Sequence, residues 1–365
     1  MLKYILLFIR KGKLMKNNHN LLMKMKNLEK FSGAIKRCVA IAMASMLFAT
    51  TGFSLDTHPV KAQEVSSSAD KIEIPEISKD AFKKYKKISG IGANTILGAD
   101  FTYYQQCLEW GKSYKNYMSQ SVDNIFDYVK SQGINTISLK VAVNPTGENA
   151  YLSLENAIKT LKAVKASNTN LKTNLVLLYS DEITYAGTQN LPADWEKAEK
   201  EEQSVTRVES AKTYTRETIA KLKQAKVLPD IVTIGNEVNW NFLGITDGEG
   251  WEGWKAMGDI SALLKKEGVK NAVSIAAQPD AASVKYIVQK LGYASVDYDY
   301  IGVNVYPDNN TNSYIKSLKN EVESCALDKQ LIVSNVEYER VNEANTANVY
   351  TQADSIYNLL EATID

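Results

Sequence analysis

Histidine is almost absent from this chain of 365 residues, because His19 and His58 are its only two and both lie within the first 62 residues. Everything after position 62 therefore lacks imidazole, which excludes Ser-His-Asp and Cys-His nucleophile systems and histidine-ligated zinc. Acid–base chemistry there must use carboxylates, tyrosine or lysine. Cysteine is also scarce: of Cys38, Cys107 and Cys325, two lie beyond position 62, and two cysteines make no disulfide framework.

The first 62 residues are basic, then apolar, then small. Lys and Arg are frequent up to Arg37, an apolar run of about 16 residues begins at Cys38, and Val60-Lys-Ala62 ends the segment. This order predicts a secretory signal peptide over residues 1–62, cleaved after Ala62, and hence a secreted protein with no membrane attachment after cleavage. A retained membrane anchor is the alternative, although the run is shorter than the roughly 20 residues that span a bilayer.

Removal of residues 1–62 reverses the charge balance of the chain. They hold 11 of the 43 Lys and Arg residues but 2 of the 42 Asp and Glu residues, so the remainder carries 32 positive and 40 negative charges, a net of −8. An acidic domain without a basic patch is a poor partner for nucleic acid or for anionic membranes. We therefore expect a neutral or external partner.

The pattern of apolar runs predicts the domain organisation. Residues 63–90 are polar and charged and are predicted to be a linker or N-terminal segment ahead of a folded domain over residues 91–365. From Ile96 onward, short apolar runs rich in Ile and Val alternate with longer amphipathic stretches. The runs predict seven strands: Ile96–Phe101, Thr136–Val143, Asn174–Tyr179, Ile231–Glu237, Ala272–Ala276, Tyr300–Tyr306 and Leu331–Val336.

The stretches between these runs repeat apolar residues at helical spacing. Continuous apolar strands that alternate with helices are typical of a parallel sheet covered by helices. No glycine-rich phosphate loop follows the first strand, since Gly90-Ile-Gly92 precedes it and lacks a third glycine, so we favour an α/β fold of the (β/α)8 TIM-barrel type. The predicted helices are Val122–Gln132, Leu154–Ala166, Val205–Ala225, Gly253–Lys266, Ala281–Leu291, Ser313–Cys325 and Thr351–Ile364.

The eighth strand and eighth helix of such a barrel are missing from this prediction. Thr351–Ile364 is the predicted seventh helix, after which the sequence stops. Either Lys71-Ile-Glu-Ile supplies a strand from the N-terminal side, or the barrel is open and exposes edges that proteins normally cover. A truncated reading frame is the plainest explanation.

One predicted strand ends in a carboxylate, because Ile231-Val-Thr-Ile runs directly into Gly235-Asn-Glu237. Functional residues of a barrel lie where its strands run out into the following loops, so Glu237 is expected at the C-terminal rim. Two carboxylates that face each other across a sugar are the minimum for hydrolysis of a glycosidic bond. In an exported, acidic, histidine-free barrel this reaction is the first to test, with Glu237 as the acid and Asn236 beside it to hold a sugar hydroxyl. An ion pair or a loop cap is the alternative role for Glu237.

Five sequence blocks carry a more specific signal: Leu97-GADFTYYQQCLEWGKSY, Gln132-GINTISLKVAVNP, Leu178-YSDEITYAGTQNLPADW, Ile234-GNEVNWNFL and Tyr300-IGVNVYP. In this order they resemble family 53 of the glycoside hydrolases, the endo-β-1,4-galactanases that cut the galactan side chains of pectic arabinogalactan. Many barrel glycosidases share Gly-Asn-Glu, whereas the first and third blocks are particular to this family. The resemblance implies a retaining (β/α)8 hydrolase with its acid/base after strand four and its nucleophile after strand seven.

Carried over by this resemblance, Glu237 is the acid/base, and the nucleophile lies in Leu331-IVSNVEYER. Aligned without a gap from Lys329, the nucleophile position falls on Asn335, an amide that cannot attack. Shifted by two residues, it falls on Glu337, which is our candidate. Alternation along a strand puts Asn335 and Glu337 on the same side but roughly 6.6 Å apart. Only one placement can be productive, because a retaining pair needs carboxyl groups about 5–5.5 Å apart.

Other positions depart from the family pattern. Strand two of the family carries arginines and a tryptophan, where this chain has Ser138, Lys140 and Ala142. A buried cation near the nucleophile keeps it ionised and orients it, which a serine cannot do. Histidines, a tryptophan and an aspartate of the family are also replaced, at Leu178, Ile183, Tyr185 and Ala276 or Ala277.

Aromatic side chains at the predicted rim suit a sugar, because a flat ring matches the apolar C–H face of a pyranose. Trp195 and one of Trp251 and Trp254 are expected to serve packing instead. Asp181 can alternatively cap its own loop. The residues predicted by this placement to bind substrate are Asp100, Asn144, Tyr179, Asp181, Asn236, Trp240 and Tyr306.

Three hypotheses stand together at this point. The first is a secreted endo-β-1,4-galactanase, or a close β-glycan hydrolase, that uses Glu237 and Glu337. The second is a non-catalytic member that keeps the groove and binds galactan without cutting it, and the third is a truncated, inactive product. The expected partner is a polysaccharide, with no nucleic acid, metal or cofactor, and the exported domain is expected to be a monomer.

Overall fold

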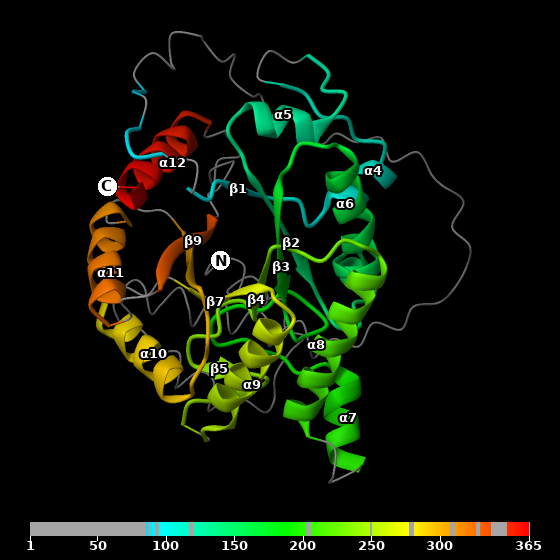
Figure 1. The fold of residues 1–365 in the computed structure, drawn as a ribbon, viewed down its shortest axis with the longest axis vertical. Coiled ribbons are helices and arrows are strands. Elements are labelled where there is room, and N and C mark those ends of the chain that lie inside the picture. The colour runs from blue at the N-terminus through cyan, green and yellow to red at the C-terminus, as the bar shows by residue number, and fades with distance from the viewer. Residues whose placement is uncertain are drawn as a thin grey trace, which may run out of the picture. The chain divides into compact units, whose positions relative to one another are not determined.

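The computed structural model of the chain covers most of the predicted folded domain (Figure 1). It describes residues 85–86, 88–91, 95–116, 120–201, 206–248, 250–276, 281–306, 311–325, 329–336 and 349–364. The predicted signal peptide over 1–62, the candidate strand at Lys71 and the candidate nucleophile Glu337 lie outside these residues. No helix within the described ranges is both long and apolar enough to cross a membrane.

Seven parallel strands form a nearly closed barrel in the order β1-β2-β3-β4-β7-β8-β9. All seven predicted strands are present, and their observed ends fall within three residues of the predicted ones. Among the described residues there is no eighth strand in this sheet, as predicted. The barrel strands are β1 (Gly98–Asp100), β2 (Thr136–Val141), β3 (Lys172–Leu177), β4 (Ile231–Ile234), β7 (Lys270–Ala276), β8 (Tyr300–Val305) and β9 (Gln330–Val336).

Helices connect the strands and form the outer layer around the barrel (Figure 1). The seven predicted helices are all present, whereas the sequence pattern missed α4, η3 and α7. α4 and η3 are six residues long and α7 is a nine-residue helix of mostly charged residues, so they are too short or too polar to show a clear apolar stripe. The helices are α4 (Tyr104–Glu109), α5 (Ile125–Ser131), η3 (Gly147–Leu152, a 3-10 helix), α6 (Leu154–Ala166), α7 (Ala193–Glu201), α8 (Arg207–Gln224), α9 (Glu252–Lys266), α10 (Ala281–Tyr293), α11 (Thr311–Cys325) and α12 (Val349–Ile364).

Alternation along the strands separates the core from the barrel interior. On β2, Ile137, Leu139 and Val141 are fully buried and belong to the main apolar cluster, which also contains Leu161 and Val164 of α6. Each such side chain contributes about 1.5–3 kcal/mol when it leaves water. This layer between sheet and helices holds the strand ends, and therefore the rim, in fixed positions.

The barrel interior is only partly apolar. One small cluster packs Tyr300 against Ile231. Polar side chains pair elsewhere in the interior: the Asn174 Nδ2 donates to Ser138 Oγ at 3.0 Å, and the Thr233 hydroxyl donates to Asn174 Oδ1 at 2.9 Å. Buried polar groups cost free energy unless they are paired in this way.

A small antiparallel hairpin that the sequence pattern did not predict follows β4. It consists of β5 (Asn241–Phe242) and β6 (Ile245–Thr246). Leu243 and Gly244 have φ values of 57° and 67°, which is the backbone of a type I′ turn. Strands of two residues are too short for a periodic signal, so only the Gly in the turn marks the hairpin.

Residues that precede β1 pack against the C-terminal helix. The Tyr85 hydroxyl donates to Asp354 Oδ1 at 2.7 Å, and the Tyr85 ring lies 5.0 Å from that of Tyr357. A Cβ built on Gly90 would meet Ile364 Cγ2 at 2.8 Å. The end of the predicted linker over 63–90 therefore belongs to the folded domain and supports α12.

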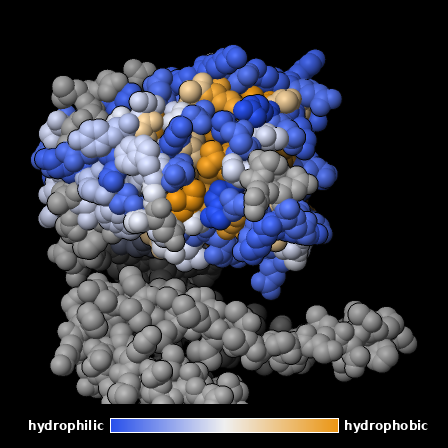
Figure 2. Space-filling view, turned by 90° about the horizontal axis from the view of Figure 1, so that it is seen from below, coloured by the Kyte–Doolittle hydropathy of each residue, from blue (hydrophilic) through white to orange (hydrophobic). Residues whose placement is uncertain are grey.

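The surface mixes polar and apolar side chains. Figure 2 shows one face on which a patch of apolar residues, in orange, lies among hydrophilic residues, in blue. Single exposed apolar residues are ordinary on folded proteins. A group of exposed aromatic rings at one place is a stronger sign of a binding surface, and the chain has such a group near the rim.

The end of β4 depends on one glycine. Gly235 has φ 69°, and a Cβ at this position would lie 2.3 Å from Val238 Cγ1. The Gly235 N–H donates to the Leu177 carbonyl oxygen at 2.9 Å, so the strand stays attached to β3 while the chain turns. This turn explains why β4 ends at Ile234 rather than at Glu237, as the apolar run predicted.

We predict that Gly235→Ala destabilises the domain more than a glycine substitution in open space. An alanine in the left-handed region costs about 1–2 kcal/mol on conformational grounds alone, and at Gly235 it also collides with Val238. Gly147→Ala is the matched control, because Gly147 has φ 57° and no neighbour within 4 Å. Urea unfolding of both variants measures the difference, and equal losses would contradict the steric account.

Candidate active site

Glu237 lies just beyond the C-terminal end of β4, at the rim of the barrel. The residue is only 3% exposed, and its backbone has φ 56°. A non-glycine residue in this left-handed region persists only where its surroundings hold it, and such strain collects at functional sites. The structure therefore has a carboxylate at the rim position predicted from the sequence, and the backbone of this residue is strained.

Three hydrogen bonds hold the Glu237 carboxylate. The Tyr306 hydroxyl donates to Oε1 at 2.7 Å, and the Asn304 Nδ2 donates to the same oxygen at 2.9 Å. The backbone N–H of Ala186 donates to Oε2 at 2.9 Å. A carboxylate offers about four lone-pair positions, so these bonds leave room for one further partner.

Asn304 is the centre of this arrangement and was not predicted. Its Nδ2 donates both to Glu237 Oε1 and, at 3.0 Å, to Asn236 Oδ1. Its Oδ1 accepts from the hydroxyls of Ser334 at 2.8 Å and Ser274 at 3.3 Å. The two hydroxyl donors fix the orientation of the amide, which keeps its N–H groups toward Glu237.

A signal for Asn304 was available in the sequence. It is a polar residue inside the apolar run Tyr300–Tyr306, and alternation puts Asn304 on the same face as Tyr306. Ala186 carried no signal, because it contributes its backbone N–H and not its side chain.

The loop after β3 holds the backbone around the glutamate. The Gln189 Nε2 donates to the carbonyl oxygens of Asn236 at 2.9 Å and Glu237 at 3.2 Å, and the Thr184 hydroxyl donates to that of Asn236 at 3.0 Å. The Asn236 Nδ2 donates in turn to the Thr184 carbonyl oxygen at 2.6 Å. As placed, the Asn236 amide supports the loop and Asn304, whereas the sequence predicted that it holds a sugar hydroxyl.

The aromatic residues divide into exposed and packed ones. Tyr306 is 45% exposed and Trp240 is 36% exposed, so both present ring surface outside the core. Trp195 lies edge-on to Tyr214 at 5.9 Å, and Trp254 is buried. The packing role predicted for Trp195 and for one of Trp251 and Trp254 is therefore confirmed, with Trp254 as the packed member of that pair.

Tyr179 lies in the core, away from any groove. It is 2% exposed, its hydroxyl is 3.0 Å from Thr215 Oγ1 of α8, and its ring meets that of Phe242 edge-on at 5.3 Å. Burial raises the pKa of Tyr179. The predicted substrate contact does not fit this placement, because the ring packs between the sheet and α8, where a polysaccharide has no access.

Asp181 and Asn144 support the rim loops. Asp181 Oδ1 accepts from the Asn144 N–H at 2.9 Å, and its Oδ2 accepts from the N–H of Ala193, the first residue of α7, at 3.0 Å. The Asn144 Nδ2 donates to Asp194 Oδ2 at 3.1 Å. Asp181 thus caps its loop and helix α7, which was the alternative role for this residue.

Asp100 is engaged by a cation from the next strand. Its Oδ2 pairs with the ammonium group of Lys140, and its Oδ1 accepts from the Thr102 N–H at 2.8 Å. The Lys140 side chain is 12% exposed. Lys140 therefore supplies a largely buried positive charge on β2, whereas Ser138 on the same strand and Ala142 just beyond its end supply none.

The end of β9 contains an irregularity that the sequence did not reveal. Gly302 to Val303 pair with Ile332 to Val333, but Asn304 pairs with Asn335, so Ser334 is an extra residue in β9. The bulge turns the Ser334 hydroxyl toward Asn304 and brings Asn335 level with the residue that holds Glu237. The competing candidate, Glu337, lies outside the described residues.

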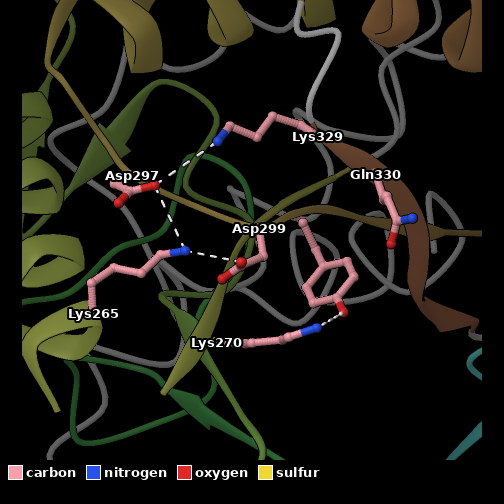
Figure 3. A pocket seen from close by; sticks show the side chains of 7 residues that line it. Lys265, Lys270, Asp297, Asp299, Lys329 and Gln330 are labelled. Atoms are coloured by element: carbon pink, nitrogen blue, oxygen red, sulfur yellow. Dashed lines mark hydrogen bonds and ion pairs between the residues drawn. The ribbon is translucent and has the colours of Figure 1, made fainter. Parts of the chain in front are cut away.

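A pocket lined by charged residues lies at the opposite end of the barrel from Glu237 (Figure 3). It has a volume of about 410 Å³, and its lining includes Lys270, Tyr300 and Gln330, which are the first residues of β7, β8 and β9. Figure 3 shows Lys265 and Lys329 both directed toward Asp297.

This charged pocket is a structural feature and not the candidate site. Lys265 lies 2.9 Å from Asp299 Oδ1 and 3.7 Å from Asp297 Oδ1. Burial lowers the pKa of Lys265, but its bonds to Asp299 and Asp297 outweigh burial and raise that pKa. Asp299 also accepts from the Asn271 N–H at 2.8 Å, so the pairs tie α9 to the starts of the strands. Catalytic groups of barrels lie at the other end.

The comparisons with known proteins agree on one family. The profile of glycosyl hydrolase family 53 matches residues 96–364. An arabinogalactan endo-β-1,4-galactanase of Cellvibrio japonicus is 29% identical over 232 residues, which are 60% of this chain and 59% of that protein. One of Thermothelomyces thermophilus is 28% identical over 253 residues, or 64% and 70% of the two chains. The chain thus spans about six-tenths of the length of the first of these relatives.

Solved structures agree with the barrel. The GH53 catalytic domain of Ignisphaera aggregans has a TM-score of 0.62 at 20% identity and covers 75% of this chain and 78% of its own. A structure from a study of two fungal β-1,4-galactanases also scores 0.62, at 19% identity, with 73% and 85% covered. At this identity the likeness concerns the fold.

We predict that Asn304→Asp makes stability depend on pH. The new carboxylate would lie about 2.9 Å from Glu237 Oε1, and two carboxylates that close cannot both ionise. The folded pair keeps a proton that the unfolded chain releases above about pH 4. Stability is therefore full below this pH and falls as the pH rises toward 8, with a steeper slope than in the wild type. Urea unfolding at several pH values measures it.

The double variant Asn304→Asp/Glu237→Gln is the matched control. The glutamine introduced by the second substitution supplies the N–H donor that the aspartate needs, so one donor again faces one acceptor and the added pH slope disappears. Equal slopes in the single variant and the wild type would show that Asn304 does not face the Glu237 carboxylate.

Proposed function

Since the chain belongs to glycosyl hydrolase family 53, we propose that it is a glycoside hydrolase that cleaves β-1,4-galactan, the side chain of pectic arabinogalactan. The proposed mechanism is retaining and uses two carboxylates. The galactanase relatives support the substrate class, and the barrel supports the position of the chemistry at the C-terminal rim.

The observation that carries the proposal is the buried carboxylate of Glu237 at the rim, held by Tyr306, Asn304 and Ala186. In its acid role, Glu237 gives a proton to the glycosidic oxygen while the bond from that oxygen to the anomeric carbon breaks. In its base role it takes a proton from the water that releases the second product. Fixed hydrogen bonds keep the carboxyl group aimed at one point in both steps.

Glu337 is the proposed nucleophile. Its carboxylate attacks the anomeric carbon to form the covalent glycosyl-enzyme, which water then hydrolyses. β9 leads to this residue, and β9 already contacts the acid/base through Ser334 and Asn304. Lys140 is a candidate for the cation that family members place on strand two as arginine.

We further propose that the exposed rings of Trp240 and Tyr306 contact the sugars, since both lie at the rim and beside Glu237 in sequence or in space. Residues 1–62 are proposed to export the protein as a signal peptide, after which it acts outside the cell as a monomer, without a cofactor. Polysaccharide too large to enter a cell requires such export.

Binding without cleavage is the second candidate function, and one observation favours it. The bulge in β9 pairs Asn335 with Asn304, so an amide stands level with the group that holds Glu237. If Asn335 occupies the nucleophile position, the chain binds galactan and no reducing ends are released.

We predict that Glu237→Gln lowers the release of reducing ends from β-1,4-galactan by about 100- to 10,000-fold, the usual contribution of an acid/base group. Glu337→Gln should lower it at least as far, whereas Asn335→Ala should leave most activity. The assay uses purified residues 63–365. A fully active Glu337→Gln variant would exclude that residue as the nucleophile, and a wild type that binds but never cuts would select the binding function.

Azide separates the two carboxylate roles. With a dinitrophenyl β-galactobioside, whose leaving group needs no proton, Glu237→Ala still forms the glycosyl-enzyme, and azide should yield a β-galactosyl azide. Glu337→Ala with azide should yield the α-azide by a single displacement. If Glu237→Ala gave the α-azide and Glu337→Ala gave the β-azide, Glu237 would be the nucleophile and Glu337 the acid/base.

A further inference from the structure

Three aromatic side chains reach the surface together beyond the candidate site. Trp240, Trp251 and Tyr286 are 36%, 38% and 37% exposed. They come from the loop after β4, the N-cap of α9 and helix α10, which are separate parts of the fold. The ring centroids of Trp240 and Tyr286 lie 5.6 Å apart. Large rings are normally driven into the core, so their shared exposure needs a reason.

Asp247 holds this group together. Its Oδ1 accepts from the buried Trp254 Nε1 at 2.8 Å, and its Oδ2 accepts from the Tyr286 hydroxyl at 2.7 Å. Lys290 of α10 lies 3.3 Å from Asp247 Oδ1. The Asp247 N–H donates to the Trp240 carbonyl oxygen at 2.8 Å, which fixes the loop that carries the first ring.

Lys290 orients two of the rings. Its ammonium nitrogen lies 5.1 Å from the centroid of Trp251 and 4.9 Å from that of Tyr286. The ammonium group lies over the faces of both rings and restrains their orientation. Unlike packing in a core, this contact leaves the rings partly exposed. The rings are thus fixed in advance, so a ligand that stacks on them does not have to order them.

The chemistry of this surface matches a sugar chain. Exposed ring faces complement the apolar C–H faces of pyranoses, while the ammonium of Lys290 and the carboxylate of Asp247 can bond to hydroxyl groups. A protein partner would call for a wider apolar surface than three half-exposed rings. The surface also continues the candidate site, because Trp240 lies three residues after Glu237 in the same loop.

We propose that Trp251 and Tyr286, with Trp240, form a platform that binds a stretch of the β-1,4-galactan chain beyond the sugars at Glu237. The inference rests on the proposed function for its ligand, but not for its test. Trp240 borders the site itself, whereas Trp251 and Tyr286 come from α9 and α10, so we expect these two rings to add affinity for long chains. Through this platform the protein would bind the galactan polymer at a distance from Glu237, in addition to the sugars on either side of the bond that is cleaved.

The test measures binding in a Glu237→Gln background, which prevents cleavage. Titration calorimetry with β-1,4-galacto-oligosaccharides of increasing length, and affinity electrophoresis in gels with galactan, compare Trp251→Ala and Tyr286→Ala with the parent. Loss of one stacked ring should weaken binding of long chains about tenfold and leave the galactobiose signal unchanged. Both side chains are exposed, so the variants should fold, and circular dichroism checks that they do.

Two controls separate stacking from a structural role. Tyr286→Phe keeps the ring and removes the hydroxyl that bonds to Asp247, so long chains should still bind. Tyr293→Ala removes a ring from the same helix that is 76% exposed but outside the cluster, and should change nothing.

The outcomes distinguish the platform from the proposed hydrolase. Unchanged binding in Trp251→Ala and Tyr286→Ala, beside galactan cleavage by the wild type, overturns the platform and leaves the hydrolase. Ring-dependent binding by a wild type that cleaves nothing overturns the hydrolase and supports the platform. A parent that binds no galactan of any length overturns the platform, and together with a wild type that cleaves nothing it overturns the hydrolase as well. Equal losses with galactobiose and long chains also overturn the platform.

Discussion

The structure depends above all on the need to satisfy one buried carboxylate. Glu237 is almost fully removed from water, and its three donors come from the loop after β3, from β8 and from the residue that follows β8. A buried carboxylate without partners would cost on the order of several kcal/mol, a large part of the net stability of a domain. Parts of the chain more than 50 residues apart must therefore meet at the rim, which requires the sheet to curve so that the end of β8 approaches the end of β4.

This constraint explains several otherwise odd residues. An asparagine stands in the apolar run of β8 because its amide must reach Glu237, and two serines on neighbouring strands fix that amide. A glycine ends β4 because only glycine can take the turn without a collision with Val238. The strands are therefore irregular at the rim, where turns and polar side chains hold the carboxylate.

Much of the fold could be predicted from the sequence because its signals are local. Runs of Ile and Val marked all seven strands, helical spacing marked seven helices, and Gly235-Asn-Glu237 marked the rim. The missed features depend on geometry that no pattern encodes. Tyr179 follows a strand end as a rim residue would, yet its φ of 53° directs the chain so that the ring packs against α8.

The bulge in β9 was invisible for a similar reason. Whether Asn335 or Glu337 faces the candidate acid/base depends on where one extra residue enters the strand, and alternation alone assumes that none does. The ladder places that residue at Ser334, between Val303 and Asn304 on the partner strand. Sequence likeness could define the family of the chain but could not fix this register.

The most direct measurement is a crystal structure of the Glu237→Gln variant with a β-1,4-galacto-oligosaccharide bound. The account predicts a glycosidic oxygen within about 3.2 Å of the substituted side chain, with the sugar chain running toward Trp240. An oligosaccharide seated at the charged pocket around Lys265, or with every glycosidic oxygen far from residue 237, would contradict it.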